Sequence, residues 1–247
     1  MCIRDSAAIA RDAGARVLVR DEPDRRGKGF GLDFAFGELL SEGFEYFLVI
    51  DADTVVDEHL VPAFRSAFAH GADAAQCRYL VANTDASLKN RLMGIARMGF
   101  NVIRSQGRER LGLSVGILGN GFGLTRETLE AVPYEATSVV EDMEYHLRLI
   151  GANRRVRFVA ETTVLADVPT GDRGATHQRA RWEGGRLRMV REHVGPLFRA
   201  ALKGQGRFVE PLFELLLQPL ALHVLLVLLA LIHASTRWYA IAALAVV

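Results

Sequence analysis

Two carboxylates, Asp51 and Asp53, directly follow an apolar run over residues 44–50 that is typical of a buried strand. Ligands of open α/β sheets bind beyond the carboxyl ends of the strands. Residues i and i+2 of an extended stretch point the same way, so both carboxylates can converge on one point. Such hard oxygen donors suit Mg²⁺ or Mn²⁺, which takes its other ligands from phosphates and water. The alternative is a helix N-cap beside a solvated loop acid.

A second acidic pair, Glu141 and Asp142, follows Val139 and Val140 and opens an expected helix. A carboxylate at such a loop–helix junction can act as the general base that removes a proton from an attacking hydroxyl. The alternative is that both acids simply complement the helix dipole in its first turn. Taken alone, this second interpretation is favoured.

A third group, Gln178, Arg181 and Trp182, has the i, i+3, i+4 spacing of one helical face. Arg181 can clamp a phosphate, Gln178 can hydrogen-bond to it, and Trp182 offers a flat surface for stacking on a sugar. Residues 171–207 contain nine Arg or Lys against three acids. The alternative is a solvated basic face near anionic lipid headgroups, and both interpretations can hold together.

Two glycine-rich segments can bring backbone close to a ligand. The first contains Gly119, Asn120 and Gly121, and a plain turn is an equal alternative. The second surrounds Lys28 and opens a helix, where backbone N–H groups and the ammonium can meet a phosphate. The Walker spacing is absent, so an NTPase is not expected.

The elements that must position these residues alternate between helix and strand. Helices are expected over residues 6–13, 27–43, 57–70, 84–110, 126–132, 141–150 and 176–193, and strands over residues 16–20, 44–50, 74–81 and 155–160. Thr125 is expected to cap the helix that follows it. This alternation predicts an α/β fold with a mostly parallel central sheet and flanking helices.

Composition limits the class of protein. The chain has 247 residues, 30 basic and 29 acidic, for a net charge of +1, which argues against wholesale nucleic-acid binding. Its two cysteines are too few for a disulfide framework and fit no zinc spacing. Residues 209–247 carry only three formal charges, and residues 211–232 form an imperfect apolar span of 22 residues. We therefore expect a domain over residues 1–208 and a membrane-associated segment over residues 209–247. A buried core helix is the alternative for that segment.

The order of these motifs (DAD at a strand end, GNG, VED, QRARW, then an apolar tail) resembles the family 2 glycosyltransferases, which have the Rossmann-like GT-A fold. The closer likeness is to the membrane-anchored branch that includes cellulose, chitin, hyaluronan and poly-N-acetylglucosamine synthases. The likeness runs from about Ser6 to Ala230, and its most specific element is QxxRW. Family members open with a strand, whereas this chain opens at a helix, so we expect an N-terminal truncation.

The resemblance implies roles for the acidic residues. Asp51 and Asp53 would bind the metal, Mg²⁺ or Mn²⁺, and the diphosphate of the nucleotide-sugar donor. Asp142 would be the base beside Glu141, with Val140 in place of the family's Thr.

The resemblance also implies that Lys28, Gln178, Arg181 and Trp182 contact the nucleotide-sugar, and that the segment 119–121 lies on the acceptor side. The protein would then be an inverting, metal-dependent hexosyltransferase acting on a saccharide or lipid-linked acceptor. It would lie at the inner or plasma membrane of a prokaryote, in contact with membrane lipids, with its catalytic domain in the cytosol. A glycoside hydrolase and an inactive membrane-associated scaffold are the alternatives.

Overall fold

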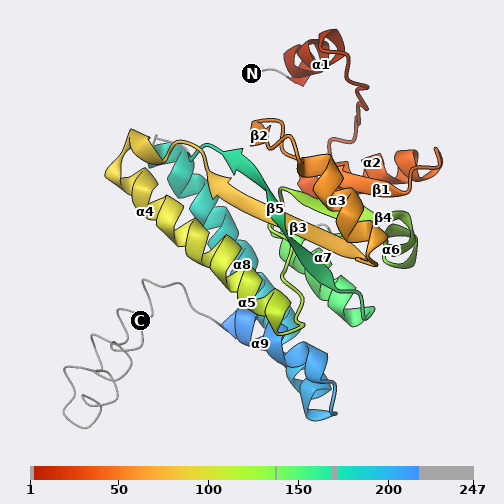
Figure 1. The fold of residues 1–247 in the computed structure, drawn as a ribbon, viewed down its shortest axis with the longest axis vertical. Coiled ribbons are helices and arrows are strands. Elements are labelled where there is room, and N and C mark those ends of the chain that lie inside the picture. Colours follow the sequence, from red (N-terminus) through yellow and green to blue (C-terminus); the bar gives the residue numbers. More distant parts are fainter. Residues whose placement is uncertain (1–2, 137, 169–171, 217–247) are drawn as a thin grey trace. The chain divides into compact units, whose positions relative to one another are not determined.

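The computed structural model describes residues 3–136, 138–168 and 172–216, with backbone alone for residues 3–5 and 172–182 (Figure 1). The chain divides into two compact units, Met1–Gly185 and Arg186–Val247. The sheet lies in the first unit, together with every candidate site residue. The division falls inside one long helix, α8 (Asp172–Leu202).

Within the described residues, one five-stranded sheet has the order β1-β4-β3-β5-β2. The strands are β1 (Tyr46–Val49), β2 (Thr54–Val56), β3 (Ala74–Val81), β4 (Phe122–Thr125) and β5 (Val156–Ala166). Only β3 and β5 pair in parallel, and the other three pairings are antiparallel. The expectation of a mostly parallel sheet is therefore wrong. β4 lies between β1 and β3 and is antiparallel to both, so it separates two strands that run in the same direction.

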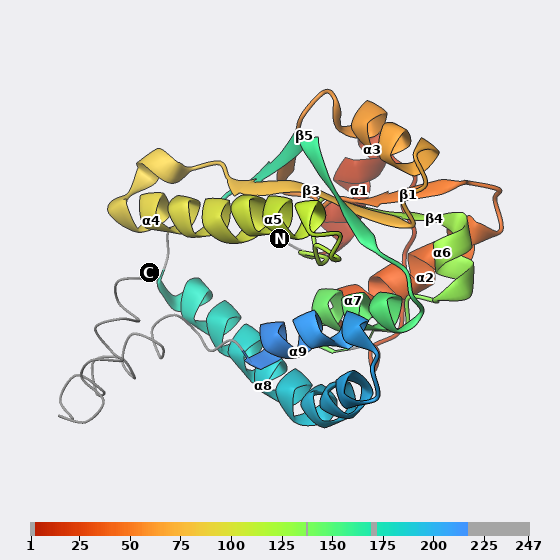
Figure 2. The same ribbon diagram turned by 60° about the horizontal axis from the view of Figure 1, so that its bottom comes forward.

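Helices cover both faces of this sheet and enclose two apolar clusters. Phe64 and Phe68 of α3 (Leu60–Ala69) pack on one face with Cys77 and Val159. The other face is covered by α2 (Lys28–Leu40), α6 (Arg126–Ala131) and α7 (Glu141–Gly151), whose apolar side chains surround the buried Phe122 of β4. Figure 2 shows α3 on one side of the sheet and α2 and α7 on the other. This α/β arrangement is consistent with a GT-A-like domain.

Most expected helices are confirmed, with shifted ends. The amino-terminal helix is α1 (Ile3–Asp12). The pattern over residues 84–110 becomes a short 3-10 helix, η1 (Thr84–Ala86), and, after the extended Ser87, one helical run built from α4 (Leu88–Arg97), the π-helical η2 (Met98–Ile103) and α5 (Arg104–Arg110). The Thr125 cap is confirmed, because its side chain accepts a hydrogen bond from the backbone N–H of Thr128.

Two strand expectations differ from the structure. Residues 16–20 are expected as a strand, but they have no regular secondary structure. Their apolar core is only three residues long, and Val19 is 59% exposed. Conversely, the three-residue strand β2 at the sheet edge is not expected, since it is too short to give a periodic signal.

The second unit contains the end of α8, the short η3 (Gly206–Phe208) and α9 (Val209–Leu216). Among the described residues, no helix combines the length and the apolar character that crossing a membrane requires. The expected membrane segment 209–247 lies outside the described residues beyond Leu216, so that expectation stays a prediction.

Candidate functional site

Lys28 connects three segments that are far apart in the sequence. It is the first residue of α2, and it follows Gly27, whose φ of 134° lies where glycine is favoured. The Lys28 ammonium forms an ion pair with Asp51, two residues after the end of β1, and donates a hydrogen bond to the Gly119 carbonyl at 2.6 Å. The structure thus brings together the expected nucleotide-contacting lysine, one expected metal-binding acid and the glycine segment.

The two acids after β1 lie in a turn and not in the expected extended stretch. The Thr54 N–H donates to the Asp51 carbonyl at 3.1 Å, which closes a tight turn between β1 and β2. The expected extended geometry, from which their convergence was inferred, is therefore wrong at this point. Asp51 is partly buried beside Lys28, whereas Asp53 is exposed at the turn.

Asn120 holds this turn against the glycine segment. Its side chain is 1% exposed, and its Oδ1 accepts a hydrogen bond from the Asp51 N–H at 3.1 Å. Its Nδ2 donates to Thr54 Oγ1 at 2.8 Å. The flanking Gly119 and Gly121 both have positive φ, 77° and 68°. A side chain at Gly121 would also meet Val164 and Cys77 within 2.7 Å, so this position requires glycine.

Gln76, which sequence analysis does not single out, clamps the same segment from β3. It is fully buried, and its Nε2 donates to the carbonyls of Asn120 and Gly121, both at 2.9 Å. Its Oε1 accepts from the Leu118 N–H at 2.9 Å. A glutamine inside the otherwise apolar start of an expected buried strand was the available signal, since a buried polar residue is the informative exception.

The start of α7 lies against this segment and against the start of α2. A Cβ placed on Gly119 would lie 3.2 Å from Asp142 Oδ2, so the carboxylate lies beside the glycine whose carbonyl binds Lys28. A Cβ on Gly29 would lie 2.1 Å from the Ala136 carbonyl oxygen and 3.2 Å from Glu141 Cβ. The amino-terminal ends of α2 and α7 are therefore close together. Such ends favour anions.

This environment shifts the pKa of Glu141. Burial raises the pKa of its carboxyl group, and the neighbouring Asp142 raises it further, while Lys28 partly offsets both effects. Carboxyl groups with perturbed pKa values are enriched at functional sites. Glu141 is thus more than a solvated acid in a first helical turn.

The third expected group lies on α8. The predicted helix over residues 176–193 is confirmed, and it includes Gln178, Arg181 and Trp182. The side chains of these three residues lie outside the described part of the chain, so their expected common face stays a prediction.

The chemistry available at the end of β1 is that of a site for a phosphate-bearing ligand. Lys28 and two helix amino termini supply positive charge, and Asp51 and Asp53 supply oxygen donors for a cation. Over the described residues, no group of three or more His, Cys, Asp or Glu is arranged to hold a metal ion. An ion held here would therefore depend on a ligand's own phosphate oxygens, as Mg²⁺ commonly does.

Residues 46–247 match the family model described as glycosyl transferase family group 2. No curated protein was found to match the chain. The matched region begins at the first residue of β1 and contains the DAD, GNG, VED and QRARW motifs. Lys28 precedes it, so the role of Lys28 depends on its contacts. Because the match covers most of the chain, the protein belongs to glycosyl transferase family group 2.

Proposed function

We propose that this glycosyltransferase is an inverting, metal-dependent hexosyltransferase that uses a nucleotide-sugar donor. The observation that carries the proposal is the chain of contacts from Asp51 through Lys28 and Gly119 to Asp142. These contacts support the proposal, because they bring Lys28, Asp51 and Asp142, to which we assign phosphate binding, metal binding and proton transfer, into one small region. A family 2 domain implies a nucleotide-sugar donor and an acceptor in general.

Asp51 and Asp53 fit a divalent ion. The Asp51 carboxylate already faces a cation, because the Lys28 ammonium is paired with it. The exposed Asp53, two residues further along the same turn, supplies a second hard oxygen donor. When bound there, Mg²⁺ or Mn²⁺ would neutralise negative charge on the departing diphosphate. Lys28 would contribute to the same neutralisation from the start of α2.

Asp142 would act as the base that takes the proton from the acceptor hydroxyl. Its carboxylate lies beside Gly119, at the segment that we expect on the acceptor side. The neighbouring Glu141 is partly buried, and burial and Asp142 raise the pKa of its carboxyl group; we assign the base to Asp142 because its carboxylate lies beside Gly119. One base and one in-line attack invert the anomeric centre, with no carboxylate needed as a nucleophile.

The acceptor and the location are part of the same proposal. A saccharide or lipid-linked acceptor at the cytosolic face of a membrane fits the apolar composition of residues 209–247. Gln178, Arg181 and Trp182 on α8 would contact the diphosphate and the sugar.

Calorimetry of nucleoside diphosphates tests the donor site. We expect the full chain to bind a nucleoside diphosphate in the presence of Mn²⁺, and we expect Asp53→Ala to lose this metal-dependent binding. Glu58→Ala is the matched control, because Glu58 is an exposed acid five residues further along. If Asp53→Ala bound nucleotide with Mn²⁺ as tightly as the parent, we would abandon the metal assignment. Release of nucleoside diphosphate from a panel of nucleotide-sugars would then identify the donor.

A further inference from the structure

The helical run α4–η2–α5 exposes its apolar residues and buries polar ones. Figure 2 shows the run as one nearly straight rod beside the sheet. Five large apolar residues on it, or at its end, are 58–76% exposed: Leu88, Leu92, Ile95, Ile103 and Leu111. Their spacing of three, four or eight residues places them along one side of the run.

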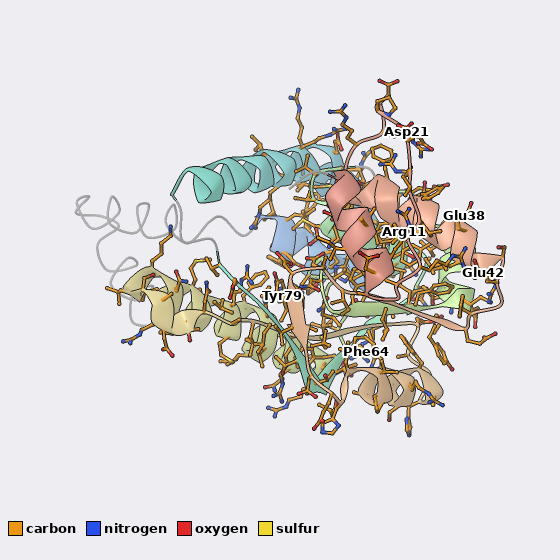
Figure 3. All side chains as sticks on the ribbon, turned by 90° about the horizontal axis from the view of Figure 1, so that it is seen from above. Arg11, Asp21, Glu38, Glu42, Phe64 and Tyr79 are labelled. Carbon is orange, nitrogen blue, oxygen red and sulfur yellow. The ribbon has the colours of Figure 1, made fainter. Side chains whose placement is uncertain are left out.

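The inner side of the run holds polar side chains that are tied to the domain. Asn101 Nδ2 donates to the carbonyl of Tyr79 on β3 at 2.7 Å (Tyr79 is labelled in Figure 3). Asn90 Nδ2 donates to the Asn83 carbonyl at 3.0 Å, and Arg108 Nη1 donates to the Val115 carbonyl at 3.2 Å. All three inner side chains are buried. A helix whose apolar side faces outward needs an apolar partner there.

An open apolar groove of about 590 Å³ lies between the run and the end of β3, next to the exposed Ile95 and Ile103. Its walls include Leu80, Val81, Ile95 and Met98, and Gly94 packs closely against Thr84. Arg91 is the only charged residue lining this groove among the described residues. The groove is thus apolar, with a cation available to bind an anionic group.

The charge of the run is strongly positive. Residues 88–111 contain six basic residues and one acid, Glu109. Glu109 is itself paired with Arg157 of β5 and with Arg155 just before that strand, which removes it as a counter-charge for the run. Lys89, Arg91 and Arg110 are exposed. Exposed apolar side chains with flanking cations are typical of helices that lie in the interface of an anionic membrane.

We propose that the exposed side of α4–η2–α5 is a lipid-binding surface that lies on the anionic face of a bilayer, with acyl chains against the apolar residues and headgroup phosphates at Lys89 and Arg91. The charge disfavours two other occupants. Residues 217–247 contain one formally charged residue, the cation Arg237, and cannot neutralise the run. A second copy would bring like charges together. This inference rests on the membrane location in the proposed function, but not on its chemistry.

Spin-label accessibility in vesicles tests this surface. Nitroxides on Ile95→Cys and Ile103→Cys are compared with Val61→Cys, which is 54% exposed on α3. Cys2 is replaced by Ser in all variants. Cys77 remains, since burial raises the pKa of its thiol to about 12 and keeps it unreactive. The full chain is reconstituted into vesicles of phosphatidylcholine and phosphatidylglycerol in equal parts.

Labels at positions 95 and 103 should collide often with oxygen and rarely with a water-soluble nickel chelate, whereas position 61 should show the reverse. Frequent nickel collisions at 95 and 103 would overturn the proposal. Rare collisions with both reagents would also overturn it, because protein would then cover the face. Nucleotide binding measured on the same samples separates failure of this surface from failure of the proposed activity.

A charge variant tests the headgroup contact. Arg91→Glu should lower oxygen accessibility at position 103 in these vesicles, and the effect should shrink at high salt. Arg65→Glu is the matched control, because Arg65 is an exposed arginine of α3. Equal effects of the two substitutions would show that Arg91 has no specific part in lipid binding.

Discussion

The end of β1 and the exposed side of α4–η2–α5 both depart from the usual distribution of residues, but in opposite directions. At the end of β1, polar and charged side chains are buried in the domain: Asn120 and Gln76 fully, and Glu141 partly. On α4–η2–α5, large apolar side chains such as Leu88 and Ile95 are left in contact with water.

The difference indicates two kinds of ligand. Buried polar groups are costly unless they are hydrogen-bonded, and those at the end of β1 are fixed by specific partners, as a site for oriented chemistry requires. Exposed apolar residues contribute little to the stability of the domain, so a large group of them is better explained by a partner outside it. Under our proposals, the first region would select a ligand by shape and charge, whereas the second would bind any apolar, anionic surface.

The largest expected effect comes from Asp142→Asn, which should impair catalysis at the end of β1 and leave the α4–η2–α5 surface unaffected. Removing the proposed base should lower the rate of transfer by about 10²–10⁴-fold, the usual contribution of a positioned acid–base group, while donor binding stays normal. Single-turnover kinetics with calorimetry on the same variant check this. Asp85→Asn, an exposed acid of η1, is the control. Weak donor binding with unchanged turnover would instead give Asp142 a ligand-positioning role.

A smaller effect is expected for Glu141→Gln, which sharpens the description of the first region. Burial raises the pKa of Glu141 in the folded chain, so ionisation of this carboxyl opposes folding. The penalty is absent below the ordinary pKa of glutamate, about 4.3, grows as pH rises from there to the raised value, and stays constant above it. The variant should therefore unfold at a higher temperature than the parent at pH 7, and the gain should vanish near pH 4.

Thermal unfolding across this pH range measures the difference. Glu161→Gln on β5 is the control, because Glu161 is exposed and its substitution should change little at any pH. A constant difference between Glu141→Gln and the parent from pH 4 to pH 7 would contradict the assignment to ionisation.

The smallest effect is expected for Leu92→Ser, which tests the second region. Leu92 is 58% exposed, so its loss should change the free energy of unfolding without lipid by no more than about 0.5 kcal/mol. Val102→Ser, at 6% exposure on the inner side of the run, should cost clearly more. Adding anionic vesicles should stabilise the parent more than Leu92→Ser, since binding to the folded state raises its stability. Equal stabilisation of both chains would count against Leu92 as a lipid contact.

Several local features of the fold could be predicted from the residues alone. The buried strand that precedes Asp51, the strand over residues 74–81, the long helical pattern over residues 84–110 and the Thr125 cap all follow from local rules of periodicity and capping, and the structure confirms them. The motif order also predicted the glycosyltransferase family.

By itself, the sequence determined which residues could do chemistry and which local elements carry them, because periodicity, capping and glycine content act over a few residues. Only the tertiary structure decided that β4 reverses between β1 and β3, that Gln76 clamps the glycine segment and that Lys28 meets Asp51. The tertiary structure was also needed to show which side of α4–η2–α5 is covered by the rest of the domain. Pairing direction and long-range contacts depend on how distant segments pack, and no local pattern contains that information.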